Sequence, residues 1–286
     1  MRYLILLLAL LTVSVQAQQR EKIDIWEGTT MPNTRGIEVV DSIANQRVYK
    51  VGRPAIYRVA PTPEKNRGIA VVICPGGGYQ RYAWEVAGWD IARWLAEEGI
   101  TGFILTARLP NSPDAVDPSI ISTQDLQRAL QVIRSRAKEW GIDPEKVGIM
   151  GASAGGNLAA QAATQFTSEE DRPDFQVLFY PFIMMSKWHA QSLLMGDTSD
   201  EAVDRYWASK QVKENTPPAF LLCSADDRTV RVQNSIEYFQ ALHAKGIQAT
   251  LHIYPSGGHG WGYEEWMPYK REWTAELERW LEQWTR

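Results

Sequence analysis

The sequence has few residues of the kinds that bind metals or form disulfide bridges. Its 286 residues include two cysteines, Cys74 and Cys223, and four histidines, and their scattered positions offer no metal-ligand cluster. A chain of this size does not need disulfides to fold, and both cysteines end segments with the character of core strands. We therefore expect two buried free thiols, with a disulfide bridge as the alternative, and no metal or other cofactor.

The sequence also lacks a basic run or patch. Thirty Lys and Arg residues face thirty-four Asp and Glu residues, which gives a net charge of -4 at pH 7. The electrostatic signature of a nucleic-acid-binding protein is missing. No nucleic-acid partner is expected, and no internal repeat or low-complexity tract is seen.

One long apolar run stands at the N-terminus, in "MRYLILLLALLTVSVQAQQ". Arg2 provides a positive start, residues 4–15 are apolar, and Val15-Gln16-Ala17 resembles a signal-peptidase site. The apolar run is too short to span a bilayer. We expect residues 1–17 to be a cleaved signal peptide. The mature protein would then be secreted or periplasmic, without stable membrane association.

Apolar, strand-like segments alternate with segments of helical periodicity over residues 18–286. This alternation is typical of a mostly parallel sheet with helices on both faces, an α/β architecture expected here as a single domain. Residues 182–216 interrupt the pattern and are expected to form a short cap. The expected strands lie in residues 47–60 and in "GIAVVIC", "TGFILTA", "KVGIMGA", "FQVLFYP", "AFLLCSA" and "TLHIYP"; the expected helices cover residues 83–98, 122–140, 154–165, 231–245 and the C-terminal segment.

Two further expectations concern the helices. Ser122 and Asp125 match a capping box at the start of the helix over 122–140. Most of the twelve tryptophans fall in apolar stripes, as in the C-terminal helix with Trp273, Trp280 and Trp284, and are expected in the core.

The segment "GIMGASAGGNLAA" places Ser153 between small residues, directly after a strand-like run and before an alanine-rich helix. This is the strand–turn–helix context of a nucleophile elbow, in which Gly151 and Gly155 allow close packing and a sharp turn exposes the serine hydroxyl. The alternative is a small-residue turn where a helix packs tightly on a sheet.

A serine nucleophile needs a base, and the base needs an acid to orient it. Of the four histidines, only His259 lies in a glycine-flanked loop after a strand, in "YPSGGHGWG". "LLCSADDRTV" ends another strand with two carboxylates, and the spacing to Val230 favours Asp227 over Asp226. The alternatives are a surface histidine and helix-capping carboxylates. The order Ser153, Asp227, His259 is nevertheless the one used by hydrolases built on parallel α/β sheets.

Acyl transfer also requires backbone N–H groups that meet a negatively charged oxygen. "CPGGGYQ" can supply them, because glycines at 76–78 leave the backbone open to close approach. Ala154, next to the serine, supplies another. A phosphate-binding loop is rejected, since neither glycine pattern of such loops is present.

The motifs "PGGGY", "GASAGG", "ADDRTV" and "GGHGW" together resemble the α/β-hydrolase superfamily. Within it, the sequence is similar to secreted bacterial carbohydrate esterases related to acetyl xylan esterases and to hormone-sensitive-lipase-like enzymes. Two positions depart from that group: Pro75 replaces the histidine of an HGGG start, and Ala87-Gly88 replaces Glu-Gly. The second departure concerns which substrate is recognised and does not concern the catalytic residues.

The resemblance implies the three-layer α/β-hydrolase fold and removal of acetyl or other small acyl groups from acylated oligo- or polysaccharides. It implies Ser153 as the nucleophile, His259 as the base, Asp227 as its partner, and Gly77, Gly78 and Ala154 as the oxyanion hole. Tyr79 and Trp261 are expected to edge the pocket, while Trp188 in the insert could either stack on a sugar or pin the insert to the core. The functional alternatives are a prolyl-oligopeptidase-type peptidase, which usually carries a large extra domain, and a non-catalytic glycan-binding protein on the same scaffold.

Overall fold

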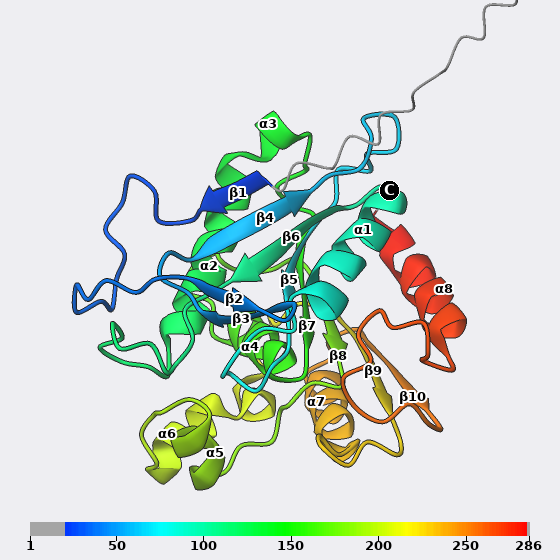
Figure 1. Ribbon diagram of the computed structural model, residues 1–286. Helices are drawn as coiled ribbons and strands as arrows, with labels where there is room; N and C mark the ends of the chain where they lie inside the picture. The colour runs from blue at the N-terminus through cyan, green and yellow to red at the C-terminus, as the bar shows by residue number, and fades with distance from the viewer. Residues whose placement is uncertain (1–20, 285–286) are drawn as a thin grey trace, which may run out of the picture.

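The computed structural model describes residues 21–284, and its centre is an eight-stranded sheet (Figure 1). Only β4 pairs antiparallel with both of its neighbours, and the strands from β6 to β10 are parallel to one another. The mostly parallel sheet predicted from the sequence is therefore confirmed. Across the sheet the order is β1 (Glu21–Asp24), β4 (Ala55–Val59), β6 (Thr101–Thr106), β5 (Ala70–Cys74), β7 (Val147–Ala152), β8 (Gln176–Phe179), β9 (Ala219–Ser224) and β10 (Ala249–Tyr254).

Helices cover both faces of this sheet and give it a separate core on each face. Along β5 the side chains alternate, so that Val72 and Cys74 join one core while Val71 and Ile73 join the other. Because both faces are covered, every residue of the central strands is buried, which explains their uninterrupted apolar runs. One face carries α2 (Ile121–Ser135), α3 (Ala137–Trp140), α4 (Ala154–Thr164) and α7 (Gln233–Ala244); the other carries the π-helical turn η1 (Glu85–Trp89), α1 (Asp90–Glu97), α8 (Lys270–Leu281) and η3 (Glu282–Trp284).

The segment expected to form a cap, residues 182–216, contains three short helices. These are α5 (Lys187–Ser192), α6 (Asp200–Tyr206) and the 3-10 helix η2 (Ala208–Gln211), and η2 contacts α4 and α7. In Figure 1, α5 and α6 lie to one side of the sheet, beyond the ends of the central strands. A small hairpin, β2 (Ser42–Ala44) with β3 (Arg47–Lys50), forms a second sheet.

Both cysteines are buried and free, as predicted. Burial raises the pKa of the Cys74 thiol, and it raises the pKa of the Cys223 thiol to about 11. Many tryptophans are core residues, and Trp261 and Trp273 are fully buried. Trp188 and Trp266 are exceptions, with more than half of each residue exposed.

The capping box predicted at Ser122 and Asp125 is wrong. Helix α2 begins one residue earlier, after Ile120, and no side chain caps it. Ser122 Oγ instead donates a hydrogen bond to the carbonyl oxygen of Arg108, and the carboxylate of Asp125 binds the guanidinium of the same residue. Ser122 and Asp125 are buried, and their side chains bind the neighbouring Arg108 rather than their own helix end.

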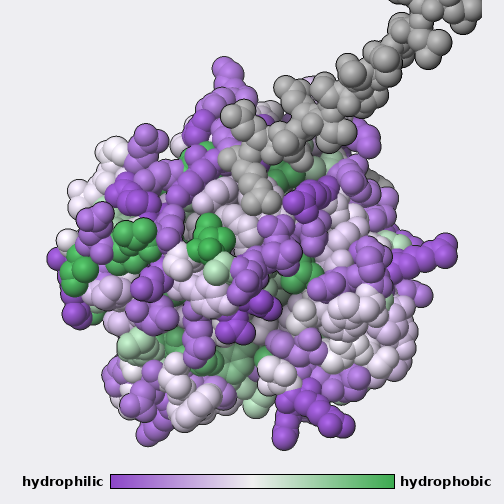
Figure 2. Space-filling model, in the orientation of Figure 1, coloured by the Kyte–Doolittle hydropathy of each residue, from purple (hydrophilic) through white to green (hydrophobic). Residues whose placement is uncertain are grey.

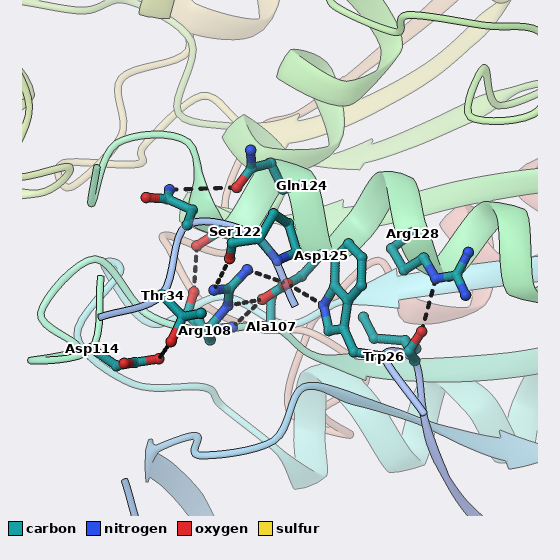
Figure 3. Close-up of polar contacts among 12 residues, drawn as sticks. Trp26, Thr34, Ala107, Arg108, Asp114, Ser122, Gln124, Asp125 and Arg128 are labelled. Carbon is teal, nitrogen blue, oxygen red and sulfur yellow. Dashed lines mark hydrogen bonds and ion pairs between the residues drawn. The ribbon is translucent and has the colours of Figure 1, made fainter. Parts of the chain in front are cut away.

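The ion pair between Arg108 and Asp125 is the centre of a buried network (Figure 3). Arg108 Nε and Nη2 donate to the two carboxylate oxygens at 3.0 and 2.8 Å, and the backbone N–H of Arg108 donates at 2.8 Å. Trp26 Nε1 donates to Asp125 at 2.8 Å, and Arg108 Nη1 donates to the carbonyl of Pro32. The network thus fastens the segment after β1 to the β6–α2 connection.

The surface in the orientation of Figure 2 is mainly hydrophilic, with separate hydrophobic groups among the polar ones. Within residues 21–284, no helix combines the length and the apolar character that crossing a membrane requires. The predicted signal peptide, residues 1–17, lies outside the described residues.

Replacing Asp125 by Asn should destabilise the protein strongly. The variant leaves the guanidinium of Arg108, whose side chain is 1% exposed, without its counter-charge. Removing one partner of a buried ion pair costs about 3–5 kcal/mol of unfolding free energy. Urea denaturation followed by tryptophan fluorescence would measure the loss.

Glu139→Gln is the matched control, since Glu139 forms a similar pair with Arg136 on the surface, where its side chain is 57% exposed. That variant should cost less than about 1 kcal/mol. Equal effects of the two variants would contradict the central role of the buried network.

Candidate active site

Ser153 lies in a sharp turn between β7 and α4. Its backbone angles are φ 55° and ψ -118°, a strained conformation for a residue with a side chain. The turn is enforced by close packing: a Cβ at Gly155 would lie 2.0 Å from the carbonyl oxygen of Cys74, and one at Gly151 would lie 2.1 Å from the carbonyl oxygen of Gly155. The small residues around Ser153 therefore serve both the tight packing and the exposure of the hydroxyl.

The three residues predicted to act together lie in one hydrogen-bonded row. His259 Nε2 is 2.8 Å from Ser153 Oγ, and His259 Nδ1 is 2.7 Å from Asp227 Oδ2. With Nδ1–H donating to the carboxylate, Nε2 has a lone pair free for the serine hydroxyl. The arrangement can remove the serine proton as the hydroxyl attacks a carbonyl carbon.

Asp227 is held by its own loop as well as by His259. Its side chain is fully buried, and Oδ1 accepts hydrogen bonds from the N–H groups of Thr229 and Val230 at 2.8 and 2.9 Å. These bonds leave Oδ2 directed at the histidine. The carboxylate is thereby fixed in position and orients the imidazole.

Asp226 has a different partner. Its Oδ1 accepts a hydrogen bond of 2.8 Å from the N–H of Gly258, in the loop that carries His259. From the sequence, helix capping is the alternative role for this carboxylate. The structure shows that it joins the loop after β9 to the loop after β10, next to the Asp227–His259 contact.

The glycine loop after β5 passes beside Ser153. Gly77 and Gly78 have φ values of 144° and 65°, and a Cβ at Gly77 would lie 1.9 Å from the carbonyl oxygen of Arg81. Within the described chain, no hydrogen bond uses the N–H of Gly77, Gly78 or Ala154 as donor. These three groups are therefore available for an oxyanion beside the serine, the role that the sequence analysis expects of them.

Tyr79 continues this loop with another positive φ, 56°, and is almost fully buried. Its hydroxyl donates a hydrogen bond of 2.7 Å to Asn157 Oδ1, one turn into helix α4. Asn157 Oδ1 also accepts from Gln161, while its Nδ2 has no partner in the described structure. The bond ties the glycine loop to the helix that begins at the nucleophile.

Ser153 and His259 open into a cavity of about 390 Å³. Much of its wall is small or apolar, with Ala83, Ala87 and Ala152 beside the three glycines of the loop. Within the described chain, no group of three or more His, Cys, Asp or Glu residues is placed to hold a metal ion. The wall comprises Arg47, Gly76, Gly77, Gly78, Gln80, Arg81, Ala83, Ala87, Ala152, Ser153, Tyr180, Leu193, Thr229, His259 and Gly260.

The three residues expected to contact substrate do not line the cavity that contains Ser153. Trp261 is fully buried against Phe179, Tyr180 and Trp273, and its Nε1 donates to Ser224 Oγ, so the expectation that it edges the pocket is wrong. Trp188 is 65% exposed on α5 and does not line the cavity of Ser153. Tyr79 lies in the wall of a neighbouring cavity, with its hydroxyl bound to Asn157.

Sequence reasoning missed several residues of the cavity, including Tyr180 and Leu193. Tyr180 follows β8 with φ 35°, packs its ring edge-on to His259 at 4.7 Å between centroids, and accepts a hydrogen bond from the N–H of Gly262. Leu193 reaches the cavity from the end of α5. Tyr180 could have been found from its place at the carboxyl end of a parallel strand, where functional residues gather.

A serine turn between strand and helix, followed in the chain by an aspartate and a histidine at later strand ends, defines the α/β-hydrolase fold. The model of the prolyl oligopeptidase family matches residues 122–286, more than half of the chain. The protein belongs to this family.

Curated relatives carry more specific names. An acetylxylan esterase of Xylanibacter ruminicola is 36% identical over 228 residues, which are 77% of this chain and 46% of that protein. Endo-1,4-beta-xylanase B of Butyrivibrio fibrisolvens is 32% identical over 227 residues, 72% of this chain and 34% of that protein. The chain thus spans less than half the length of these relatives.

The structure also resembles a solved one over nearly its whole length. This is the crystal structure of an acetyl ester-xyloside bifunctional hydrolase from Caldicellulosiruptor lactoaceticus, with a TM-score of 0.79 and 27% identity. The match covers 94% of this chain and 98% of that one. The three-layer α/β-hydrolase architecture expected from the sequence is confirmed.

Replacing Gly155 by Ala should slow the reaction of Ser153 with a fluorophosphonate probe by about tenfold or more. The new methyl group would meet the carbonyl oxygen of Cys74, so α4 and the serine must shift. A displacement of about 1 Å in a reacting group can reduce rates by about 100-fold. Labelling rates from mass spectrometry would measure the change.

Gly246→Ala, after helix α7, is the control. It has a positive φ of 72° but open space around the added Cβ, so it should cost about 1–2 kcal/mol in stability and leave the labelling rate unchanged. Normal labelling of the Gly155 variant would show that the close packing does not position the serine.

Proposed function

We propose that this protein is a serine ester hydrolase that removes acetyl or other small acyl groups from carbohydrates, with xylan-type substrates, through a covalent acyl-enzyme. The observation that carries the chemistry is the row of hydrogen bonds from Asp227 through His259 to Ser153, at 2.7 and 2.8 Å. The substrate class is supported by the names of the acetylxylan esterase, the xylanase and the acetyl ester-xyloside hydrolase that the chain resembles.

In the first half of the reaction, Ser153 Oγ attacks the ester carbonyl carbon while His259 Nε2 takes the hydroxyl proton. The carbonyl oxygen becomes negatively charged and is met by the N–H groups of Gly77, Gly78 and Ala154. When the tetrahedral intermediate collapses, the bond to the sugar oxygen breaks. His259 returns its proton to that oxygen, so the sugar leaves as an alcohol.

In the second half, water attacks the acyl carbon of the serine ester. His259 takes one water proton, the tetrahedral intermediate forms again, and its collapse releases the carboxylic acid and returns the proton to Ser153 Oγ. Asp227 stabilises the protonated imidazole in both halves without taking the proton itself. The small residues around the serine, including Ala83 and Ala87, suit a short acyl group.

Ser153→Ala should reduce hydrolysis of 4-nitrophenyl acetate and of acetylated xylan by at least about 1,000-fold, because the covalent step is lost. The urea unfolding midpoint should stay close to that of the parent protein. Ser135→Ala, at the far end of α2 where the hydroxyl bonds only to the carbonyl of Val132, should keep full activity. Retained hydrolysis in the Ser153 variant would exclude the mechanism.

A prolyl-oligopeptidase-type peptidase is the second candidate, because the matching family model has that description. The same residues can cleave an amide, since the tetrahedral intermediate is alike. Hydrolysis of aminoacyl-proline anilides without hydrolysis of acetyl esters would favour this candidate. A non-catalytic glycan-binding protein would leave Ser153 unlabelled by fluorophosphonate.

We also infer that the protein is exported, from the N-terminal sequence in residues 1–17. Expression of the full chain in a bacterial host should yield a mature protein that begins at Gln18, recovered from the periplasm or the medium. N-terminal sequencing of the recovered protein would test this. Retention of Met1 in a cytoplasmic product would contradict it.

A further inference from the structure

A second cavity lies beside the one that contains Ser153. Its volume is about 340 Å³, and it shares Gln80, Arg81 and Leu193 with the first. The shared residues form the boundary between the two spaces. The remaining wall of the second cavity consists of Tyr49, Tyr79, Asn111, Ser192 and Met195.

The second cavity is assembled from segments far apart in the sequence. Tyr49 comes from β3, which is joined to the loop after β5 by backbone hydrogen bonds between Val48 and Tyr82. Ser192, Leu193 and Met195 come from the end of α5 and the residues after it, in the inserted segment. The hairpin, the glycine loop and the insert therefore meet at this one place beside the nucleophile.

The two cavities differ in their chemistry. Around Ser153, seven of the fifteen wall residues are glycine or alanine, and Arg47, Gln80 and Arg81 also contribute to the wall. The second cavity shares Gln80 and Arg81 with the first, but its wall has no glycine or alanine and adds the amide of Asn111 and the hydroxyl groups of Tyr49 and Ser192. An ester between a short fatty acid and a sugar is divided in the same way, since its acyl part is small and apolar and its alcohol part carries many hydroxyl groups.

Four polar side chains of the second cavity are available to a ligand, whereas the hydroxyl groups of Tyr79 and Ser192 already donate to Asn157 and to the carbonyl of Trp188. Within residues 21–284, the side chains of Tyr49, Gln80, Arg81 and Asn111 make no hydrogen bond or ion pair with another residue. Arg81 is also fixed in place at its backbone, because its carbonyl oxygen packs against Gly77. Sugar hydroxyl groups both donate and accept hydrogen bonds, so they match this mixture of amide, phenol and guanidinium groups.

We propose that the second cavity is the subsite for the sugar part of the ester, while the acyl group occupies the glycine- and alanine-lined cavity at Ser153. This proposal rests on the proposed esterase function and adds the direction in which the substrate lies. The sugar extends from Ser153 across Arg81 toward Tyr49 and Asn111, between the hairpin and the inserted segment.

The test compares two substrates that share an acetyl group and differ in the alcohol. Acetylated xylo-oligosaccharides can fill the second cavity, whereas 4-nitrophenyl acetate has no sugar to place there. In Arg81→Ala and in Asn111→Ala, the ratio of kcat/KM for the oligosaccharide to kcat/KM for the nitrophenyl ester should fall about tenfold, as expected when a hydrogen bond worth about 1.4 kcal/mol is lost.

Arg279→Ala is the matched control, because Arg279 lines a different cavity, between β10 and α8. It should leave the ratio unchanged. An unchanged ratio in both the Arg81 and the Asn111 variants would overturn the proposal, and so would equal losses on the two substrates.

A binding measurement separates failure of the subsite from failure of the esterase function. In the Ser153→Ala background, unsubstituted xylotetraose should perturb the NMR signals of the Gln80 and Asn111 side-chain amides, and Arg81→Ala should weaken this binding. If the parent protein hydrolyses acetyl esters but xylotetraose does not perturb these amides, the subsite is wrong and the proposed function stands. If hydrolysis is absent but the amides respond, the esterase function is wrong and the sugar site stands.

Discussion

Close backbone packing between helix α4 and the ends of β5 and β7 is the constraint on which the site depends. Three glycines allow it: Gly151 against the carbonyl of Gly155, Gly155 against the carbonyl of Cys74, and Gly76 against the carbonyl of Ala152. Each position would bring a Cβ within 2.7 Å of a backbone oxygen. The packing sets the distance between the nucleophile and the glycine loop, and so the distance between the attacking oxygen and the groups that stabilise its product.

The sheet topology explains why the other loops of the site meet at one place. Each part of the site follows one strand of the parallel sheet, and these strands bring their carboxyl ends to one edge. The glycine loop follows β5 and Ser153 follows β7. Tyr180, Asp227 and His259 follow β8, β9 and β10, respectively. Asp226 and Gly258 then join the last two loops directly. The reacting side chains are therefore placed by strand order and by a few contacts between the loops at the strand ends.

The predictions from sequence were right where a local pattern decides the structure. Ser153, Asp227 and His259 each stand in a short glycine- or acid-containing loop after an apolar strand, and that context is visible without any tertiary information. The predictions were wrong where a side chain contacts a segment distant in sequence instead of the neighbour that the local pattern suggests. Asp125 fits a capping box by spacing but binds Arg108, and Trp261 follows His259 in sequence but packs into the core. Such contacts depend on residues far away in the sequence, and the residues next to Asp125 or Trp261 give no information about them.

The two cavities at the site are built by different means, and this bears on how specificity is set. Part of the cavity at Ser153 is formed by glycines and alanines close to the packing of α4, so this part can change little without moving the nucleophile. The second cavity is formed by longer side chains from the β2–β3 hairpin, the loop after β5, the β6–α2 connection and the inserted segment. Substitutions at Tyr49, Asn111 or Met195 can alter it without touching the contacts among Ser153, His259 and Asp227. The fold thus separates a rigid centre for acyl transfer from a border that can be adapted to the alcohol part of the ester.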